Sequence, residues 1–132
     1  MAPNGQRLRL EVAQLAAAYP GLRIAQDDSW VLIPEFRLPA GWEPVLTTVL
    51  VIVPATYPEC APDGFFLGSL LRRHDGTVLS RPGHYFYDYK NPYSGLGYVW
   101  YCLEDPDRQW DPLADSLLTF VEAIRTYLGT AD

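Results

Sequence analysis

The chain has 132 residues, which is enough for one domain with a sizeable hydrophobic core and too few for two. It is 48% hydrophobic, 14% aromatic and 20% charged, a composition typical of a globular chain and unlike that of a disordered one. The formal net charge of −6 argues against nucleic acid as the main partner, because phosphate binding requires clustered Lys and Arg. We therefore expect a single domain over residues 1–132.

No segment of the sequence predicts export or membrane insertion. Met1–Arg9 is polar and basic and no apolar stretch follows it, which is unlike a signal peptide. The longest apolar run, Val49–Val53, is far shorter than the ~20 residues that span a bilayer. We expect a cytoplasmic protein in which both cysteines are free thiols.

The first half of the chain predicts a helix followed by antiparallel strands. Asn4–Tyr19 has apolar side chains at spacings of three and four, which predicts an amphipathic helix ended by a Pro-Gly pair. Short strands are expected over Leu22–Ala25 and Trp30–Leu38, the second with an edge position or a bulge at Pro34. Val45–Val53 is almost entirely apolar or β-branched, so it should form the central, most buried strand.

The second half predicts a short strand, a long irregular segment and a strong helix. Phe65–Leu67 is the expected strand, and Gly68–Gly97 is expected to be irregular, with a small hairpin at Asp75-Gly76. Pro112–Leu128 has the pattern of a helix with Asp111 as its N-cap. The expected buried face consists of Leu113, Leu117, Phe120, Ile124 and Leu128. The fold class is therefore α+β: an N-terminal helix, an antiparallel β-meander, a long irregular loop and a C-terminal helix.

Cys102 is the candidate nucleophile, because a thiol that is exposed and partly ionised is the best side-chain nucleophile near neutral pH. It lies where an aromatic, strand-like run gives way to a polar loop. A buried, inert cysteine fits that position equally well, since free cysteines are among the most buried residues. Nearby carboxylates would raise the pKa of the thiol, which suits an acyl carrier better than a protease; they are Glu104, Asp105, Asp107 and Asp111. Cys60, in a proline-rich turn, is interpreted as a small apolar filler.

Two segments together resemble ubiquitin-conjugating enzymes. Cys102 is followed by seven residues, Trp110, one residue, Pro112 and a helix pattern, the order that follows the active-site cysteine of that family. Upstream, Val53–Phe66 resembles the stretch that ends the family's sheet; its matching positions are Tyr57, Pro58, Pro62 and Phe66. More narrowly, the chain resembles divergent bacterial members encoded in ubiquitin-like conjugation operons. Trp110 is expected to brace the loop after Cys102 against the final helix.

The resemblance implies a shortened ubiquitin-conjugating fold, with the irregular segment as an active-site loop, and a transferase reaction. An activating enzyme would pass the C-terminal carboxyl of a ubiquitin-like modifier protein to Cys102 as a thioester, and an amine would then attack it. The implied partners are this activating enzyme, the modifier and a deconjugating protease, and the implied setting is antiphage defence. No cofactor is implied, and the spacing of His and Cys predicts no metal site.

The chain departs from the family at the His-Pro-Asn motif that precedes the cysteine. Pro92, Tyr93 and Ser94 stand at those positions, so the donor for the tetrahedral oxyanion must come from elsewhere. Asn91, which has an amide, and His84, which can exchange a proton near neutral pH, are the first candidates; Ser94 offers only a hydroxyl. Each also has a plain interpretation as a turn or loop residue.

Two other functions stay open. The chain could be an inactive relative that binds a ubiquitin-like protein or another partner, which the missing His-Pro-Asn motif favours. It could also be a cysteine hydrolase that uses Cys102, His84 and an acidic residue, a geometry that the sequence does not reveal. Thiol reactivity separates the binding module from both enzymes. Dependence on ATP and an activating enzyme separates the transferase from the hydrolase.

Overall fold

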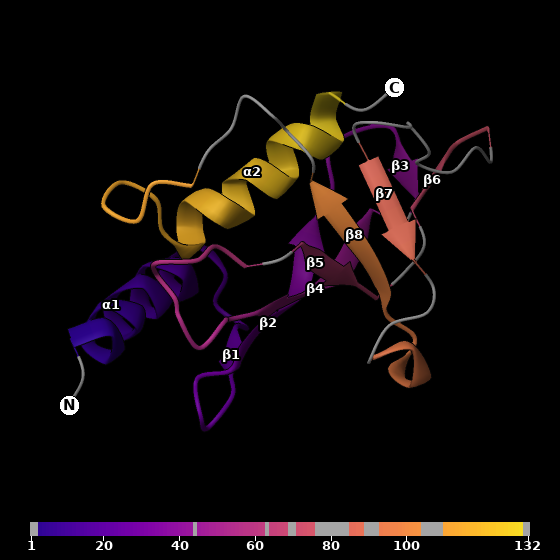
Figure 1. Cartoon of the computed structure of the whole chain (residues 1–132). Coiled ribbons are helices and arrows are strands. Elements are labelled where there is room, and N and C mark those ends of the chain that lie inside the picture. Colours follow the sequence, from indigo (N-terminus) through magenta and orange to yellow (C-terminus); the bar gives the residue numbers. More distant parts are fainter. Residues whose placement is uncertain are drawn as a thin grey trace.

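Two α-helices and an antiparallel sheet form the described part of the chain, so the fold is α+β, as predicted (Figure 1). The computed structural model describes residues 3–43, 45–62, 64–68, 71–75, 85–88, 93–103 and 110–130. The elements are α1 (Pro3–Ala18), β1 (Arg23–Ile24), β2 (Trp30–Arg37), β3 (Trp42–Glu43), β4 (Leu46–Ile52), β5 (Phe65–Leu67), β6 (Arg72–Arg73), β7 (Tyr85–Asp88), the short 3₁₀ helix η1 (Ser94–Leu96), β8 (Val99–Leu103) and α2 (Leu117–Thr130).

The main sheet has the strand order β1-β2-β4-β5-β8-β7, with antiparallel pairing throughout. β4 lies between β2 and β5, and its Val49 and Val51 are buried, which confirms the predicted central strand. The register of β2 against β4 shifts between Ile33 and Phe36. β1 pairs only with Val31 and Leu32 of β2, so Pro34 lies both at the register shift and beyond the residues that pair with β1, in line with the expected edge position or bulge.

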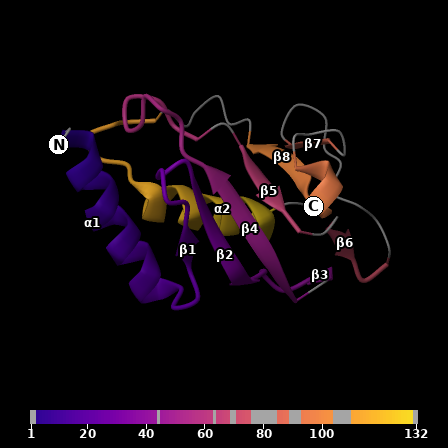
Figure 2. The same ribbon diagram turned by 90° about the horizontal axis from the view of Figure 1, so that it is seen from below.

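The helices bury their apolar faces against this sheet. Figure 2 shows α2 crossing behind the sheet and α1 lying beside β1 and β2. In α1, Leu8 and Leu15 are buried in the core and Val12 packs against it half-buried, as the helical spacing predicts. Tyr19, directly after the end of α1 at Ala18, also packs against the core half-buried. Burying one such side chain fully contributes about 1.5–3 kcal/mol. Neither helix in the described part is long and apolar enough to cross a bilayer.

The start of the C-terminal helix differs from the prediction, since α2 begins at Leu117 and not at Pro112. Ser116 is its N-cap. The Ser116 Oγ accepts a hydrogen bond from the Thr119 N–H at 3.3 Å, and the Thr119 Oγ1 accepts one from the Ser116 N–H at 2.8 Å. This reciprocal pair is a capping box with Thr in the place usually held by Glu or Gln.

Asp111 caps a separate turn. Its Oδ1 accepts a hydrogen bond from the Leu113 N–H at 3.0 Å, a local bond that competes with helix formation. Leu113 is consequently 94% exposed, so its assignment to the buried face is wrong. The rest of the predicted face is buried and confirmed: Leu117, Phe120, Ile124 and Leu128.

The segment Gly68–Gly97, predicted to be irregular, contains strands. Arg72–Arg73 forms β6, which pairs with β3 in a second, two-stranded sheet. Tyr85–Asp88 forms β7, which pairs with β8 at the end of the main sheet's strand order. Its aromatic, strand-forming composition was a signal that the prediction of an irregular segment left unused. The hairpin expected at Asp75-Gly76 extends to residues that lie outside the described ones.

Candidate active site

Cys102 is the penultimate residue of β8, the strand enclosed by β5 and β7. Its backbone lies opposite Phe86 of β7, and Tyr101 before it lies opposite Phe65 of β5. The prediction that an aromatic strand carries the cysteine is thus confirmed. β8 ends at Leu103, and residues 104–109 lie outside the described part.

Tyr101 fixes β8 in the sheet immediately before the cysteine. It is only 1% exposed, and its ring stacks on that of Phe65 with centroids 5.7 Å apart and planes at 11°. Its hydroxyl accepts a hydrogen bond from the Leu71 N–H at 3.0 Å. A buried ring held at its polar end as well as its face has little freedom, so the backbone on this side of Cys102 is well anchored.

Gly64 packs directly against the same part of β8. Its φ is +72°, a left-handed conformation that favours glycine. A Cβ added there would lie 2.4 Å from the Tyr101 carbonyl oxygen and 2.6 Å from the Trp100 Nε1. The chain therefore reaches β5 in a conformation and at a distance that only glycine allows.

The segment after residues 104–109 returns to the turn that carries the other motif of the sequence. The Trp110 Nε1–H donates a hydrogen bond to the Pro58 carbonyl at 2.6 Å, and the Trp110 and Tyr57 ring centroids are 5.9 Å apart. Trp110 is half-buried against the core. Trp110 was expected to brace the loop after Cys102 against the final helix. The hydrogen bond of its ring instead joins it to the Tyr57–Pro58 turn.

A buried carboxylate, which the sequence analysis missed, joins this turn to both helices. Glu11 of α1 is 5% exposed; its Oε2 lies 2.7 Å from the Arg7 Nε, and its Oε1 accepts a hydrogen bond from the Leu117 N–H at 2.8 Å. The same Oε1 accepts a hydrogen bond from the Tyr57 hydroxyl. Burial, followed by the hydrogen bond and the charge of Glu11, raises the pKa of Tyr57 above its ordinary value. The available signal was an acidic residue between Leu8 and Leu15 in the apolar stripe of α1.

The other predicted site residues are unevenly covered. His84, Asn91, Glu104, Asp105 and Asp107 lie outside the described residues. The backbone of Ser94 opens η1. Of the chain between His84 and Asn91, the described strand β7 pairs with β8, with Tyr85 opposite Leu103 and Asp88 opposite Trp100.

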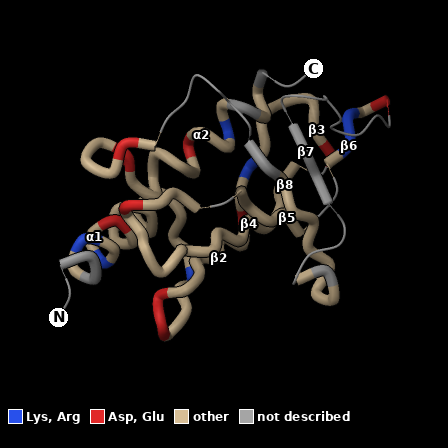
Figure 3. Tube along the Cα trace, viewed as in Figure 1, with Lys and Arg blue, Asp and Glu red and all other residues tan. Residues whose placement is uncertain are grey.

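Cys60 is exposed, so its interpretation as an apolar filler is wrong. It lies in the turn after Pro58, where its N–H donates to the Thr56 carbonyl at 3.4 Å. No group of three or more His, Cys, Asp and Glu side chains within the described ranges could hold a metal ion. In the view of Figure 3, acidic and basic positions are interspersed along the described trace.

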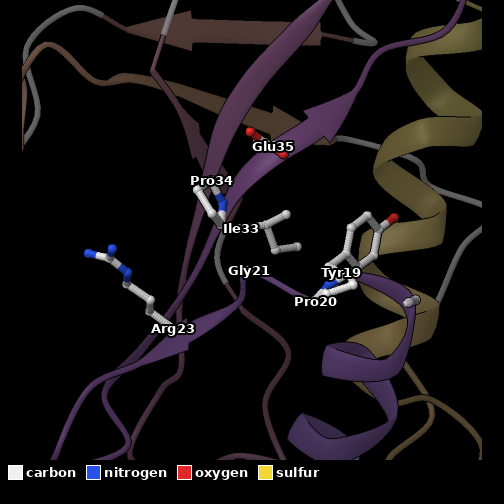
Figure 4. A pocket seen from close by; sticks show the side chains of 8 residues that line it. Tyr19, Pro20, Gly21, Arg23, Ile33, Pro34 and Glu35 are labelled. Carbon is white, nitrogen blue, oxygen red and sulfur yellow. The ribbon is translucent and has the colours of Figure 1, made fainter.

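A surface pocket at the end of α1 lies apart from this arrangement (Figure 4). Its lining includes Tyr19, Pro20, Gly21, Arg23, Ile33, Pro34 and Glu35. These residues come from β2 and from the chain between α1 and β2, which includes β1, and β4 and β5 separate β2 from β8 in the sheet. The pocket is therefore not part of the site around Cys102.

Comparison with known proteins gives one match. The model of the family described as prokaryotic E2 family E matches residues 22–131. The match includes the Tyr57–Pro58 turn, Cys102 and Trp110, and it begins after α1. Nothing among the curated proteins or the solved structures matches the chain.

Proposed function

The chain belongs to the prokaryotic E2 family E, and we propose that it carries a ubiquitin-like modifier as a thioester on Cys102 and transfers it to an amine. Family membership assigns the chain to ubiquitin-like conjugation and implies an activating enzyme and a modifier as partners in general. The thioester on Cys102 and the amine acceptor are the specific content of the proposal. A deconjugating protease, a cytoplasmic location and a role in antiphage defence complete it by analogy with operon-encoded relatives.

The observation that carries this proposal is the contact between the two motifs. The hydrogen bond of 2.6 Å from Trp110 to the Pro58 carbonyl joins the segment that follows Cys102 to the Tyr57–Pro58 turn. Residues that resemble the family in sequence are therefore neighbours in space, although 52 positions separate them. An incidental match of short motifs gives no reason for such a contact.

The proposed reaction has two balanced steps. In the first, the Cys102 sulfur bonds to the modifier's carbonyl carbon, the bond from that carbon to the activating enzyme's sulfur breaks, and the thiol proton of Cys102 passes to the released thiolate. In the second, an amine nitrogen bonds to the same carbon, the bond to the Cys102 sulfur breaks, and a proton from nitrogen returns to the sulfur. Both steps pass through a tetrahedral oxyanion, which a placed hydrogen-bond donor stabilises.

His84 and Asn91 are the proposed donors. Phe86 lies opposite Cys102 in the pairing of β7 with β8. Along the chain, His84 is two positions before Phe86 and Asn91 five positions after it, so His84 is the first donor to test.

A charging assay tests the proposal. The protein is mixed with ATP, the activating enzyme and the modifier, and the adduct is followed by non-reducing gel and intact mass. We expect a thiol-sensitive adduct that is lost in Cys102→Ala and kept in Cys60→Ala, the matched control with its exposed thiol. Cys102→Ser should give an adduct that resists thiols, because an oxygen ester replaces the thioester.

Two results would reject the transferase. If the activating enzyme is charged and this chain never is, the chain is a binding module. If it cleaves modifier conjugates without ATP, and Cys102→Ala abolishes the cleavage, it is a hydrolase.

A further inference from the structure

We propose that Glu11 of α1 is a positioning residue for the reaction at Cys102, acting through Tyr57 and Trp110. This inference rests on the proposed function, because it concerns a residue that would position the site of that same reaction. Glu11 lies outside the segment that matches the family, so the match assigns it no role.

The first step of the argument is the geometry around the carboxylate. Glu11 is 5% exposed and receives bonds from three parts of the chain: Arg7 of its own helix, the Tyr57 hydroxyl of the turn, and the Leu117 N–H that begins α2. A carboxylate at this N–H also sits at the favourable, positive end of the α2 dipole. Because these three donors approach the carboxylate from fixed directions, they favour a single arrangement of α1, the Tyr57–Pro58 turn and α2.

The second step leads from the carboxylate to the loop after Cys102. Arg7 donates to the main-chain carbonyls of Pro112 and Asp115, while Tyr57 packs against the Trp110 ring. Residues 110–117 are thus held from both sides. Trp110 follows Cys102 in the chain with seven residues between them. Displacements of about 1 Å near reacting atoms can cost 10²-fold in rate, so we expect a shift of the Trp110 contact to affect the reaction at Cys102.

The third step compares Glu11 with the residue that packing alone would favour. Its position lies between Leu8 and Leu15, in the stripe of α1 that faces the core. An apolar side chain there would avoid desolvating a charge and often stabilises as well as or better than a buried ion pair. The carboxylate adds directional hydrogen bonds that an apolar side chain cannot make, because the Tyr57 hydroxyl and the Leu117 N–H donate to the same Glu11 oxygen atom.

The test uses Glu11→Gln and, as a milder change, Tyr57→Phe, which leaves Glu11 bonded to Arg7 and Leu117. Each variant is charged with the modifier, separated from ATP so that it cannot be charged again, and then discharged with free lysine as the amine. Only charged molecules are counted, so the rate per molecule is independent of the folded fraction. We expect the maximal discharge rate to fall about 10-fold in Glu11→Gln and less in Tyr57→Phe, with the half-saturating lysine concentration unchanged.

Two controls separate positioning from stability. Leu15→Ala removes a buried side chain of the same helix that takes part in none of the hydrogen bonds of Glu11; its melting temperature should fall as far or further, with an unchanged discharge rate. Glu11→Gln should lower the rate no further when Trp110→Phe is already present, because both changes act through one contact chain.

A second readout does not depend on conjugation. In the Cys60→Ala background, the rate at which iodoacetamide alkylates Cys102 should change in Glu11→Gln and Tyr57→Phe but not in Leu15→Ala. If the native protein is never charged, the proposed function fails while this measurement still tests the positioning role. If Glu11→Gln and Tyr57→Phe lower stability but alter neither alkylation nor discharge, Glu11 only joins the helices and the inference is wrong.

Discussion

Replacing Gly64 by alanine should destabilise the protein by about 2–4 kcal/mol. The left-handed φ of +72° costs an alanine about 1 kcal/mol. The added Cβ would also lie 2.4 Å from the Tyr101 carbonyl oxygen and 2.6 Å from the Trp100 Nε1. Relieving such overlaps by shifting backbone typically costs about 1–3 kcal/mol more. Because the added Cβ disturbs β8, the strand that carries Cys102, the same variant should also form less thioester adduct in the charging assay.

Two other glycines serve as controls that separate the cost of the left-handed φ from the cost of the steric overlaps. Gly97 has a φ of +91° with open space around its Cβ position, so Gly97→Ala should show only the conformational cost of about 1 kcal/mol. Gly95 has the same open space and no positive φ, so Gly95→Ala should change stability by less than about 0.5 kcal/mol. The assay is urea unfolding followed by tryptophan fluorescence. If Gly64→Ala costs no more than Gly97→Ala, the close packing of Gly64 on β8 is refuted.

Two further changes test the core and the buried tyrosine. Thr47 is 6% exposed and its hydroxyl has no hydrogen-bond partner among the described residues, so Thr47→Val should raise the free energy of unfolding by about 1 kcal/mol. Thr48→Val, which removes a bond to the Pro34 carbonyl, should not raise it, and an equal gain in both variants would contradict the reasoning. The raised pKa of Tyr57 makes the native state hold a proton that the unfolded state releases above about pH 10. Stability should therefore be intact below that pH and fall as the pH rises beyond it, less steeply in Tyr57→Phe; equal slopes in unfolding measurements from about pH 9 to 11 would contradict the shift.

Local patterns predicted the elements whose signals lie within a few residues. The apolar stripe of α1 and the apolar run of β4 are of this kind. A helix buried on one face has apolar side chains at spacings of three and four, and a strand buried on both faces has a continuous apolar run. The start of α2 was misplaced because Asp111-Pro112 carries a strong local signal for a helix start. Ser116 and Thr119 form the competing cap that the structure uses.

Features that depend on distant partners were missed for a physical reason. Arg72–Arg73 was predicted as part of a hairpin around Asp75-Gly76, but its pairing as β6 with β3, some 30 positions earlier, has no signal in two residues. Glu11 can be recognised as important only when its bonds to Tyr57 and Leu117, 46 and 106 positions away, are known. The position of Cys102 on its strand could be predicted, whereas the buried contacts that hold that strand, such as Leu71 to Tyr101, could not.

The bulge in β2 bears on how the protein avoids aggregation. β1 pairs with Val31 and Leu32, and the Ala25 N–H bonds to the Trp30 carbonyl, so within the described pairing β2 has no strand partner on that side beyond Leu32. A regular strand edge invites another chain to add to it, and such pairing is a route to insoluble assemblies. Here the edge is broken where Pro34 provides no N–H, and the exposed charges of Glu35 and Arg37 follow. We therefore expect that replacing Pro34 with valine would make it easier for separate copies of the chain to join along β2.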